Sequence, residues 1–154
     1  GPENKDKVEW LTMEEAMKRA EKKPKKIFID VYTDWCGWCK KMDRDTFSDP
    51  EVVKYLNKNF YAVKLNAESK EDITLKGRTY KFKPEYKSHE LAIELLQGRM
   101  SYPSTVYLDE QQQVITAVPG YLQVDTFEKL LHFFKDDHYK TKKWDEFEAS
   151  YKIK

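Results

Sequence analysis

Cysteine is scarce in this chain, with only two copies among 154 residues. Small secreted proteins that depend on disulfides carry several pairs, so the chain does not belong to that class. A structural zinc site usually takes four cysteine or histidine ligands, and the sequence has no second cysteine pair. Among the three histidines, only His132 and His138 have a ligand-like spacing, and they lie far from the cysteines. We therefore expect no metal site.

The chain also lacks an excess of either charge, and it lacks long apolar runs. Lys and Arg total 28 and Asp and Glu total 27, so the net charge of +1 gives no electrostatic basis for binding nucleic acid. No apolar run approaches the ~20 residues that span a bilayer, so we expect no membrane span. Hydrophobic residues make up 40% and aromatic residues 14%, which is enough for the core of one domain.

The sequence begins without a methionine and without a signal peptide. Gly1 and Pro2, followed by a polar run, resemble the scar that a protease leaves on a trimmed chain. We expect residues 1–7 to be this scar and a flexible N-terminus. An export signal removed at this point would leave no trace, so the N-terminus does not decide between cellular compartments.

The first half of the chain predicts a helix and a buried strand. Residues 11–24 have an apolar helical stripe, and Thr12 with Glu15 forms a capping-box pattern at its start. Residues 25–33 are rich in Ile, Phe, Val and Tyr, which is typical of a central strand buried on both faces. Asp30 interrupts this strand, and on the pattern alone it is either functional or a partly exposed strand residue.

Further helices and a second strand follow the cysteines. A helix is predicted at 48–60, where Asp49 serves as the cap and Pro50 takes the first helical position. Residues 61–68 predict the next strand. Strand, helix and strand in this order predict a parallel pair joined by a right-handed crossover.

The second half of the chain predicts hairpins and helices. A hairpin with Lys76-Gly77 at its turn is expected within a polar segment, and a helix at 88–98 is expected to be capped by Ser88 and ended by Gly98. The pattern then predicts an antiparallel hairpin, an amphipathic helix and a last short helix, at 101–121, 123–137 and 141–151. The three histidines are interpreted as surface or helix residues.

Cys36 and Cys39 stand two residues apart, at the junction between the strand and a helix. There, the unpaired backbone N–H groups and the helix dipole favour a thiolate on Cys36. Cys39, about one turn later, is close enough to resolve a mixed disulfide. A structural disulfide is the alternative, but so short a loop would remove little unfolded-state entropy and would stabilise weakly.

Three stretches carry a resemblance to a known family. "DVYTDWCGWCKKMDRDTFSDPEVV" (30–53) resembles the thioredoxin family, and especially the C-terminal thioredoxin-like domain of the bacterial transmembrane thiol:disulfide interchange reductase. "YAVKLNAE" (61–68) and "YPSTVYLDE" (102–110) fall where that family has its next strand and its cis-proline loop. The resemblance covers about residues 25–134.

The resemblance implies an α/β, thioredoxin-like fold with a central mixed sheet flanked by helices. The expected domain is 8–135, with an insertion at about 68–98 before the cis-proline loop, and a C-terminal helical extension at 136–154. The dipeptide between the cysteines, Gly37-Trp38, departs from the Gly-Pro of thioredoxin itself.

The resemblance also implies roles for the exchange chemistry. Cys36 would be the nucleophile and Cys39 the resolving thiol of a redox-active disulfide. Asp30 matches a buried acid beneath the cysteines, whose pKa burial would raise and which would take or return the proton of Cys39. Lys64 matches the family lysine near this acid, although it also fits an ordinary exposed strand lysine.

The expected substrate-binding residues surround the cysteines. Pro103 matches the family's cis-proline, and Tyr102 before it would present its backbone to the substrate. Gly37 and Trp38 lie between the cysteines, and Trp38 is expected to face solvent and to form an apolar rim with Tyr102. Trp35 is assigned to the same surface, with a packing role as the alternative. Outside this set, Gly120 is interpreted as a backbone requirement.

We therefore predict a thiol–disulfide oxidoreductase that reduces protein disulfides and needs no cofactor. Its expected partners are protein disulfides and an upstream electron donor, for which the resemblance supplies a membrane thiol:disulfide reductase as the example. A disulfide oxidase or isomerase and a non-catalytic binding module are the alternatives. The resemblance implies a periplasmic or cell-envelope setting, with the cytoplasm as the alternative.

Overall fold

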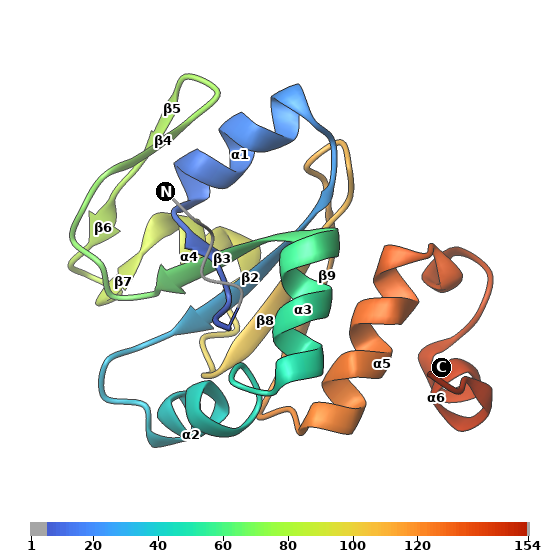
Figure 1. The fold of residues 1–154 in the computed structure, drawn as a ribbon. Helices are drawn as coiled ribbons and strands as arrows, with labels where there is room; N and C mark the ends of the chain where they lie inside the picture. The colour runs from blue at the N-terminus through green and yellow to red at the C-terminus, as the bar shows by residue number, and fades with distance from the viewer. Residues whose placement is uncertain (1–5, 154) are drawn as a thin grey trace.

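A computed structural model describes residues 6–153 of the protein. Residues 1–5 of the expected N-terminal scar, and Lys154, lie outside the described residues. The central sheet has five strands in the order β1-β3-β2-β8-β9 (Figure 1). They are β1 (Trp10–Leu11), β2 (Lys26–Tyr32), β3 (Phe60–Asn66), β8 (Ser104–Leu108) and β9 (Val114–Pro119). Within 6–153, no helix combines the length and apolar character needed to cross a membrane.

Strand direction confirms the predicted mixed sheet. β2 is parallel to β3 on one side and antiparallel to β8 on the other, and β9 completes the predicted antiparallel hairpin. The register of the parallel pair places Asp30 opposite Lys64. The short edge strand β1, which pairs in parallel with β3, was not predicted.

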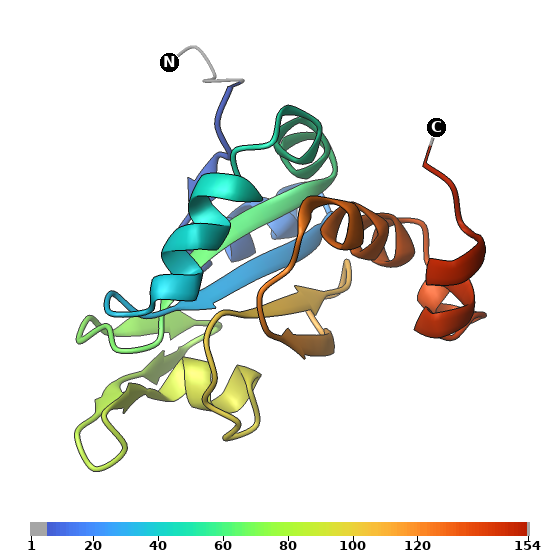
Figure 2. The same ribbon diagram turned by 90° about the horizontal axis from the view of Figure 1, so that it is seen from below.

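Helices cover both faces of the sheet (Figure 2). Helices α1 (Met13–Lys22) and α4 (Glu90–Leu95) cover one face, and α2 (Gly37–Asp45), α3 (Pro50–Asn59) and α5 (Val124–Lys135) cover the other. Because side chains alternate along a strand, β2 serves both layers. Ile27, Ile29 and Val31 enter the core on the α1 side, whereas Phe28 enters the core on the α5 side.

The predicted helix starts of α1 and α3 are confirmed. Thr12 and Glu15 form a reciprocal capping box on α1. Asp49 caps α3 by accepting hydrogen bonds from the first-turn N–H groups of Glu51 and Val52. Both caps satisfy backbone donors that the first turn of a helix would otherwise leave without partners.

The insertion between β3 and β8 forms two small hairpins and α4. The predicted turn at Lys76-Gly77 joins β4 (Ile73–Leu75) to β5 (Arg78–Tyr80), and both turn residues have positive φ. The second hairpin pairs β6 (Phe82–Lys83) with β7 (Ser88–His89). Its two short strands were not predicted.

Two predictions in the insertion are wrong. Ser88 belongs to β7, and the cap of α4 is His89, whose Nδ1 accepts a hydrogen bond from the N–H of Leu91 at 3.2 Å. His89 is also fully buried, so it is neither a surface residue nor a helix residue. An imidazole can cap a helix because its unprotonated nitrogen is a hydrogen-bond acceptor.

The C-terminal extension packs against α5 through aromatic rings. It contains the 3-10 helix η1 (His138–Lys140) and α6 (Trp144–Ser150), which confirms the predicted last helix. Phe147 is fully buried, with its ring 5.0 Å from that of Phe133 on α5. Figure 1 places this extension and the insertion on opposite sides of the sheet.

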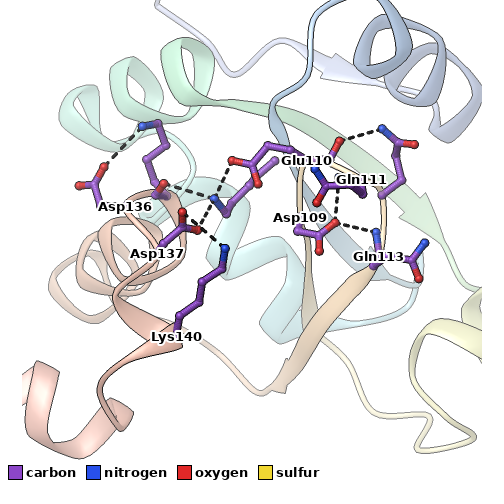
Figure 3. Close-up of polar contacts among 10 residues, drawn as sticks. Asp109, Glu110, Gln111, Gln113, Asp136, Asp137 and Lys140 are labelled. Atoms are coloured by element: carbon purple, nitrogen blue, oxygen red, sulfur yellow. Dashed lines mark hydrogen bonds and ion pairs between the residues drawn. The ribbon is translucent and has the colours of Figure 1, made fainter.

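A buried lysine joins the extension to the start of β2. Lys26 is 1% exposed, and its Nζ lies 2.9 Å from carboxylate oxygens of both Glu110, in the β8–β9 turn, and Asp137. It also donates to the carbonyl of Lys135 at 3.3 Å. Figure 3 shows Glu110 and Asp137 on facing segments of this cluster. We call these residues the Lys26 cluster.

Candidate active site

The two cysteines lie at the start of α2 and are joined by a disulfide. Cys36 is the N-cap residue, and its Sγ accepts a hydrogen bond from the N–H of Cys39 at 3.1 Å. Both residues are buried, at 5% and 2% exposure. The start of the helix therefore directs backbone N–H groups at this sulfur, as the sequence predicted.

This location favours the reactive form of the thiol after reduction. The N–H donor and the positive end of the α2 dipole stabilise a thiolate on Cys36 more than a thiol. Cys39 is one turn further along the same helix, with its Cα 5.3 Å from that of Cys36. Within 6–153, no cluster of three or more His, Cys, Asp or Glu side chains is arranged to hold a metal ion.

Asp30 is a buried acid on β2, at 1% exposure. Its Oδ2 accepts a hydrogen bond from Nζ of Lys64 at 2.7 Å, and the same Nζ lies 2.5 Å from Oδ1 of Asp43 on α2. Burial raises the pKa of Asp30 to about 6, and Lys64 opposes part of this rise. Lys64 therefore bridges the buried acid to Asp43 on the helix that begins with the cysteines.

Lys64 remains a cation despite its partial burial. Burial alone would lower the pKa of Lys64, but attraction and hydrogen bonds from Asp30 and Asp43 outweigh it, and the pKa is raised. Its Nζ also lies near three aromatic rings, those of Trp10, Tyr32 and Phe47, at 5.1, 4.7 and 5.5 Å. Rings at such distances stabilise a cation through their negative faces.

Asp43 is a site residue that the sequence analysis did not name. It lies four positions after Cys39, and residues four apart share one face of a helix. Its carboxylate is 45% exposed and pairs with Lys64 from the solvent side, opposite Asp30. The helical spacing alone was the available signal for this residue.

The loop before β8 carries the expected proline. The Tyr102–Pro103 peptide bond is cis, and Pro103 is buried. The carbonyl of Pro103 accepts a hydrogen bond from the N–H of Gly120 at 2.8 Å, which ties this loop to the end of β9. Gly120 has a φ of 104°, a conformation that side chains disfavour, so it is a backbone requirement as predicted.

Two aromatic pairs join the cysteine segment to the loop before β8 and to the segment after β9. The ring of Trp35 packs edge-on against Tyr102 at 5.9 Å, and the ring of Trp38 packs against Tyr121 at 5.3 Å. Trp35 and Trp38 are nevertheless 66% and 60% exposed. The predicted exposure of Trp38 is confirmed, and most of the surface of Trp35 also faces solvent, so Trp35 is not a core residue.

The pairing within the rim also differs from the predicted one. Tyr102 contacts Trp35, and the partner of Trp38 is Tyr121, which the sequence analysis missed. The position of Tyr121 directly after Gly120 was the signal that would have found it. Gly37 is exposed, and a Cβ at this position would meet nothing within 4 Å, so the surface is open beside the first cysteine.

Comparison with known proteins decides the family. The profile of the family described as "Thioredoxin-like domain" matches residues 13–135, which is most of the chain. The chain belongs to the thioredoxin-like family. This thioredoxin-like protein has the predicted mixed sheet and the predicted cysteine pair at a helix start.

Sequence relatives of the thioredoxin-like protein are much longer. Spermatogenesis-associated protein 20 of Mus musculus is 34% identical over 67 residues, which cover 43% of this chain and 8% of that protein. The thiol:disulfide interchange protein DsbD of Escherichia coli K12 is 50% identical over 36 residues, covering 23% and 6%. The chain thus matches less than a tenth of the length of these relatives.

A solved structure supports the fold. The C-terminal domain of Neisseria meningitidis DsbD, in its reduced form, superposes with a TM-score of 0.55 at 20% identity. The superposition covers 79% of this chain and 93% of that domain. At this identity, the likeness shows the thioredoxin-like fold, in agreement with the resemblance noted in the sequence.

Proposed function

We propose that this protein is a thiol–disulfide oxidoreductase that exchanges disulfides with polypeptide substrates. One observation carries the proposal: the Cys36–Cys39 disulfide lies at the N-terminus of α2, and Lys64 ties the same helix, through Asp43, to the buried Asp30 carboxyl group, whose pKa is about 6. The similarity to DsbD over the matched segment supports it. Perturbed pKa values in combination with a nucleophile are typical of catalytic sites.

Exchange in the reducing direction takes two steps. The Cys36 thiolate attacks one sulfur of a substrate disulfide, a new S–S bond forms, and the other substrate sulfur leaves as a thiolate that takes up a proton. Cys39 then loses its proton and attacks Cys36, which releases the second substrate thiolate. The substrate gains two electrons and the enzyme ends as the Cys36–Cys39 disulfide, which is the state of this structure.

Asp30 is the proposed acceptor of the Cys39 proton. A carboxyl group with a pKa of about 6 is mostly ionised at neutral pH, yet it is basic enough to hold a proton briefly. Lys64 keeps the buried carboxylate from becoming neutral altogether, because its ammonium group attracts the ionised form. Asp30 and Lys64 therefore form the proton-handling part of the proposed site.

The proposed substrate surface consists of residues in the cysteine segment and in the loops that contact it. Its members are Trp35, Gly37, Trp38, Tyr102 and Pro103, to which the structure adds Tyr121. Two aromatic pairs formed by the tryptophans next to the cysteines suit a polypeptide substrate, because aromatic rings give a large contact area at low cost in conformational entropy.

Cysteine variants test the proposed chemistry. We expect Cys36→Ser to abolish the reduction of insulin disulfides, and Cys39→Ser to accumulate a mixed disulfide between Cys36 and its substrate on non-reducing gels. Mass spectrometry of the trapped species would identify substrates. A Cys36→Ser variant that kept its full biological activity would contradict the proposal and would favour a non-catalytic binding module.

The direction of electron flow is proposed from the similarity to an interchange protein. We place the protein as a reductase that is itself reduced by an upstream dithiol donor. Titration against glutathione redox buffers measures its reduction potential. We expect a value in the reducing range, about −270 mV. A potential of about −120 mV would instead identify an oxidase, whose substrates are free thiols.

We propose a periplasmic or cell-envelope setting, which the partial match to DsbD supports. Fractionation of the source cells, followed by immunoblotting against a cytoplasmic marker and an envelope marker, tests this location. Recovery in the cytoplasmic fraction would contradict the proposed setting and would mean that the protein exchanges disulfides in the cytoplasm.

A further inference from the structure

The insertion contacts the tryptophan that precedes the first cysteine. Nε1 of Trp35 donates a hydrogen bond to Oε1 of Glu68 at 3.0 Å, and Glu68 is the second residue after β3. The backbone of Glu68 is fixed in turn, because its N–H donates to Oδ1 of Asn66 at 2.9 Å. An exposed indole ring is therefore held by a residue outside the cysteine motif.

The other ring of this pair also rests on the insertion. Tyr102 packs against the core on the α1 side, to which the insertion contributes Ile73, Tyr80 and Leu91. The side chain of Ser88 lies beside the Tyr102 hydroxyl and lowers its pKa against the larger, raising effect of burial. Both members of the Trp35–Tyr102 pair thus have support from residues 68–98.

The insertion itself is held together by a buried histidine. The N–H of His89 donates to the carbonyl of Ala67 at 2.6 Å, and its Nε2 bonds with the carbonyl of Glu71 at 2.8 Å. Since its Nδ1 caps α4 at Leu91, one residue links the first residues of the insertion to its helix. The support beneath Trp35 and Tyr102 is consequently an ordered unit.

The second aromatic pair offers a contrast. Trp38 packs on Tyr121, which follows β9, and Lys41 of α2 lies 5.5 Å from the Tyr121 ring. These contacts come from the common frame of the fold, without any residue of the insertion. The contacts with the insertion therefore distinguish the Trp35–Tyr102 pair from the Trp38–Tyr121 pair.

We infer that the insertion selects substrates by fixing the Trp35–Tyr102 pair, with Glu68 as its positioning residue. The favoured substrates are disulfides in extended polypeptide segments that carry a bulky apolar side chain next to the cysteine. A ring already fixed in place loses little further freedom when such a side chain packs on it, which preserves the gain from apolar burial. This inference rests on the proposed exchange function and specifies its substrate class.

Three substitutions separate positioning by Glu68 from other effects. Glu68→Ala removes the acceptor for Trp35, and Glu68→Gln keeps an acceptor oxygen while removing the charge. Trp35→Phe removes the donor from the opposite side and keeps an aromatic ring. Glu85→Ala, an exposed carboxylate elsewhere in the insertion, is the matched control.

The assay compares three substrates: two cysteine-containing peptides as glutathione mixed disulfides, with either Leu or Ser next to the cysteine, and a small aromatic disulfide. We expect the wild-type protein to prefer the Leu peptide through KM. Glu68→Ala should raise KM for the Leu peptide about fivefold, the equivalent of ~1 kcal/mol for one hydrogen bond, with kcat unchanged. Turnover of the small disulfide should stay the same in Glu85→Ala and in the two Glu68 variants.

The remaining outcomes decide the inference. Three results together would support positioning through this one bond. Glu68→Gln should keep the wild-type KM for the Leu peptide, Trp35→Phe should raise KM as much as Glu68→Ala does, and the double variant Glu68→Ala/Trp35→Phe should raise it no further. Unchanged preference for the Leu peptide in Glu68→Ala, or an equal loss in Glu85→Ala, would overturn it. If the wild-type protein turned over none of the three disulfides, the proposed function itself would have failed, which is a separate result.

Discussion

Two lysine–carboxylate clusters on β2 use the same chemical groups with opposite burial. Near the end of the strand, the carboxylate of Asp30 is 1% exposed and its lysine partner, Lys64, is 20% exposed. At the start of the strand, the lysine is 1% exposed and its partners, Glu110 and Asp137, are 37% and 45% exposed. One cluster buries the acid, and the other buries the base.

The difference in burial separates a titrating group from a permanent ion pair. Burial raises the pKa of Asp30 to about 6, so this group changes its charge close to neutral pH. The hydrogen bond from Lys26 lowers the pKa of Asp137, and the two carboxylates raise the pKa of Lys26 despite its burial. The first cluster suits proton transfer, whereas the second keeps its charges across the whole physiological range.

The largest effect is expected from removing both carboxylates around Lys26. Glu110→Gln combined with Asp137→Asn keeps acceptor oxygens beside the buried ammonium group of Lys26 but removes both opposing charges. An uncompensated buried charge is strongly destabilising, and we expect a loss of about 3 kcal/mol in the free energy of unfolding by urea. Asparagine at 137 tolerates the left-handed backbone there, so the loss reports the charge.

Two further variants complete this test. Asp109→Asn with Asp136→Asn removes the same amount of charge from neighbouring residues (Figure 3), and we expect little change in stability. Adding Lys26→Met to the first double variant should restore much of the loss, since no buried charge then remains. Equal free energies of unfolding for the two double variants would show that the two carboxylates beside Lys26 do not stabilise the fold.

Removing the charge of Asp30 is expected to raise the free energy of unfolding near neutral pH, which is the opposite of the change expected in the Lys26 cluster. Because the pKa of Asp30 rises from 3.8 to about 6 on folding, the folded state binds more protons than the unfolded state between these values. The free energy of unfolding therefore falls as the pH rises from about 4 to about 6, by on the order of 3 kcal/mol. Asp30→Asn should remove this dependence.

At pH 7, we expect oxidised Asp30→Asn to be more stable than the wild type by the same ~3 kcal/mol, because the folded wild type then carries a buried carboxylate that the variant lacks. At pH 4, the two proteins should unfold at similar urea concentrations. Asp34→Asn, an exposed acid in the loop that follows β2, is the control. A variant less stable than the wild type at pH 7 would show that burial does not penalise the Asp30 carboxylate.

A smaller effect is expected from Lys64→Met. Loss of the opposing charge should raise the pKa of Asp30 by about one unit, measured from the NMR shift of its carboxyl carbon. The pH at which disulfide exchange accelerates should move upward with it. Lys41→Met, which breaks the exposed pair with Asp45 on α2, is the matched control. An unchanged Asp30 titration would remove Lys64 from the proposed proton-handling site.

The smallest effect is expected from Asp43→Asn. Asp43 repels the Asp30 carboxylate and competes for Lys64, so its loss should lower the pKa of Asp30. Because Asp43 is 45% exposed and screened by solvent, we expect a shift of less than about half a unit in the same NMR titration. A rise in the Asp30 pKa would contradict the bridging arrangement.

Much of the fold was predictable because local patterns agreed with the tertiary structure. The apolar run of β2, the cap at Asp49 and the turn at Lys76-Gly77 each depend on a few neighbouring residues. The cysteine pair and Asp30 were also found from the sequence, since they stand out against an apolar strand and a helix start.

The missed features depend on contacts between distant segments. A lysine at the start of a strand is usually exposed, and only the folded chain brings Glu110 and Asp137 over Lys26. Ser88 is the commoner capping residue, but strand pairing with Lys83 removes it from the helix start. Glu68 likewise gives no sequence signal, because its partner lies 33 residues earlier.

The place of the insertion in the chain has an evolutionary consequence. It begins after β3 and ends before Tyr102, so both of its junctions lie beside residues that contact Trp35, and no central strand is interrupted. Mutation, lengthening or shortening of this segment changes neither the sequence of β2 nor the two cysteines. If the insertion selects substrates, changes in this one segment between β3 and β8 alter substrate preference without altering the residues that exchange electrons. Substrate preference and disulfide chemistry can then evolve independently.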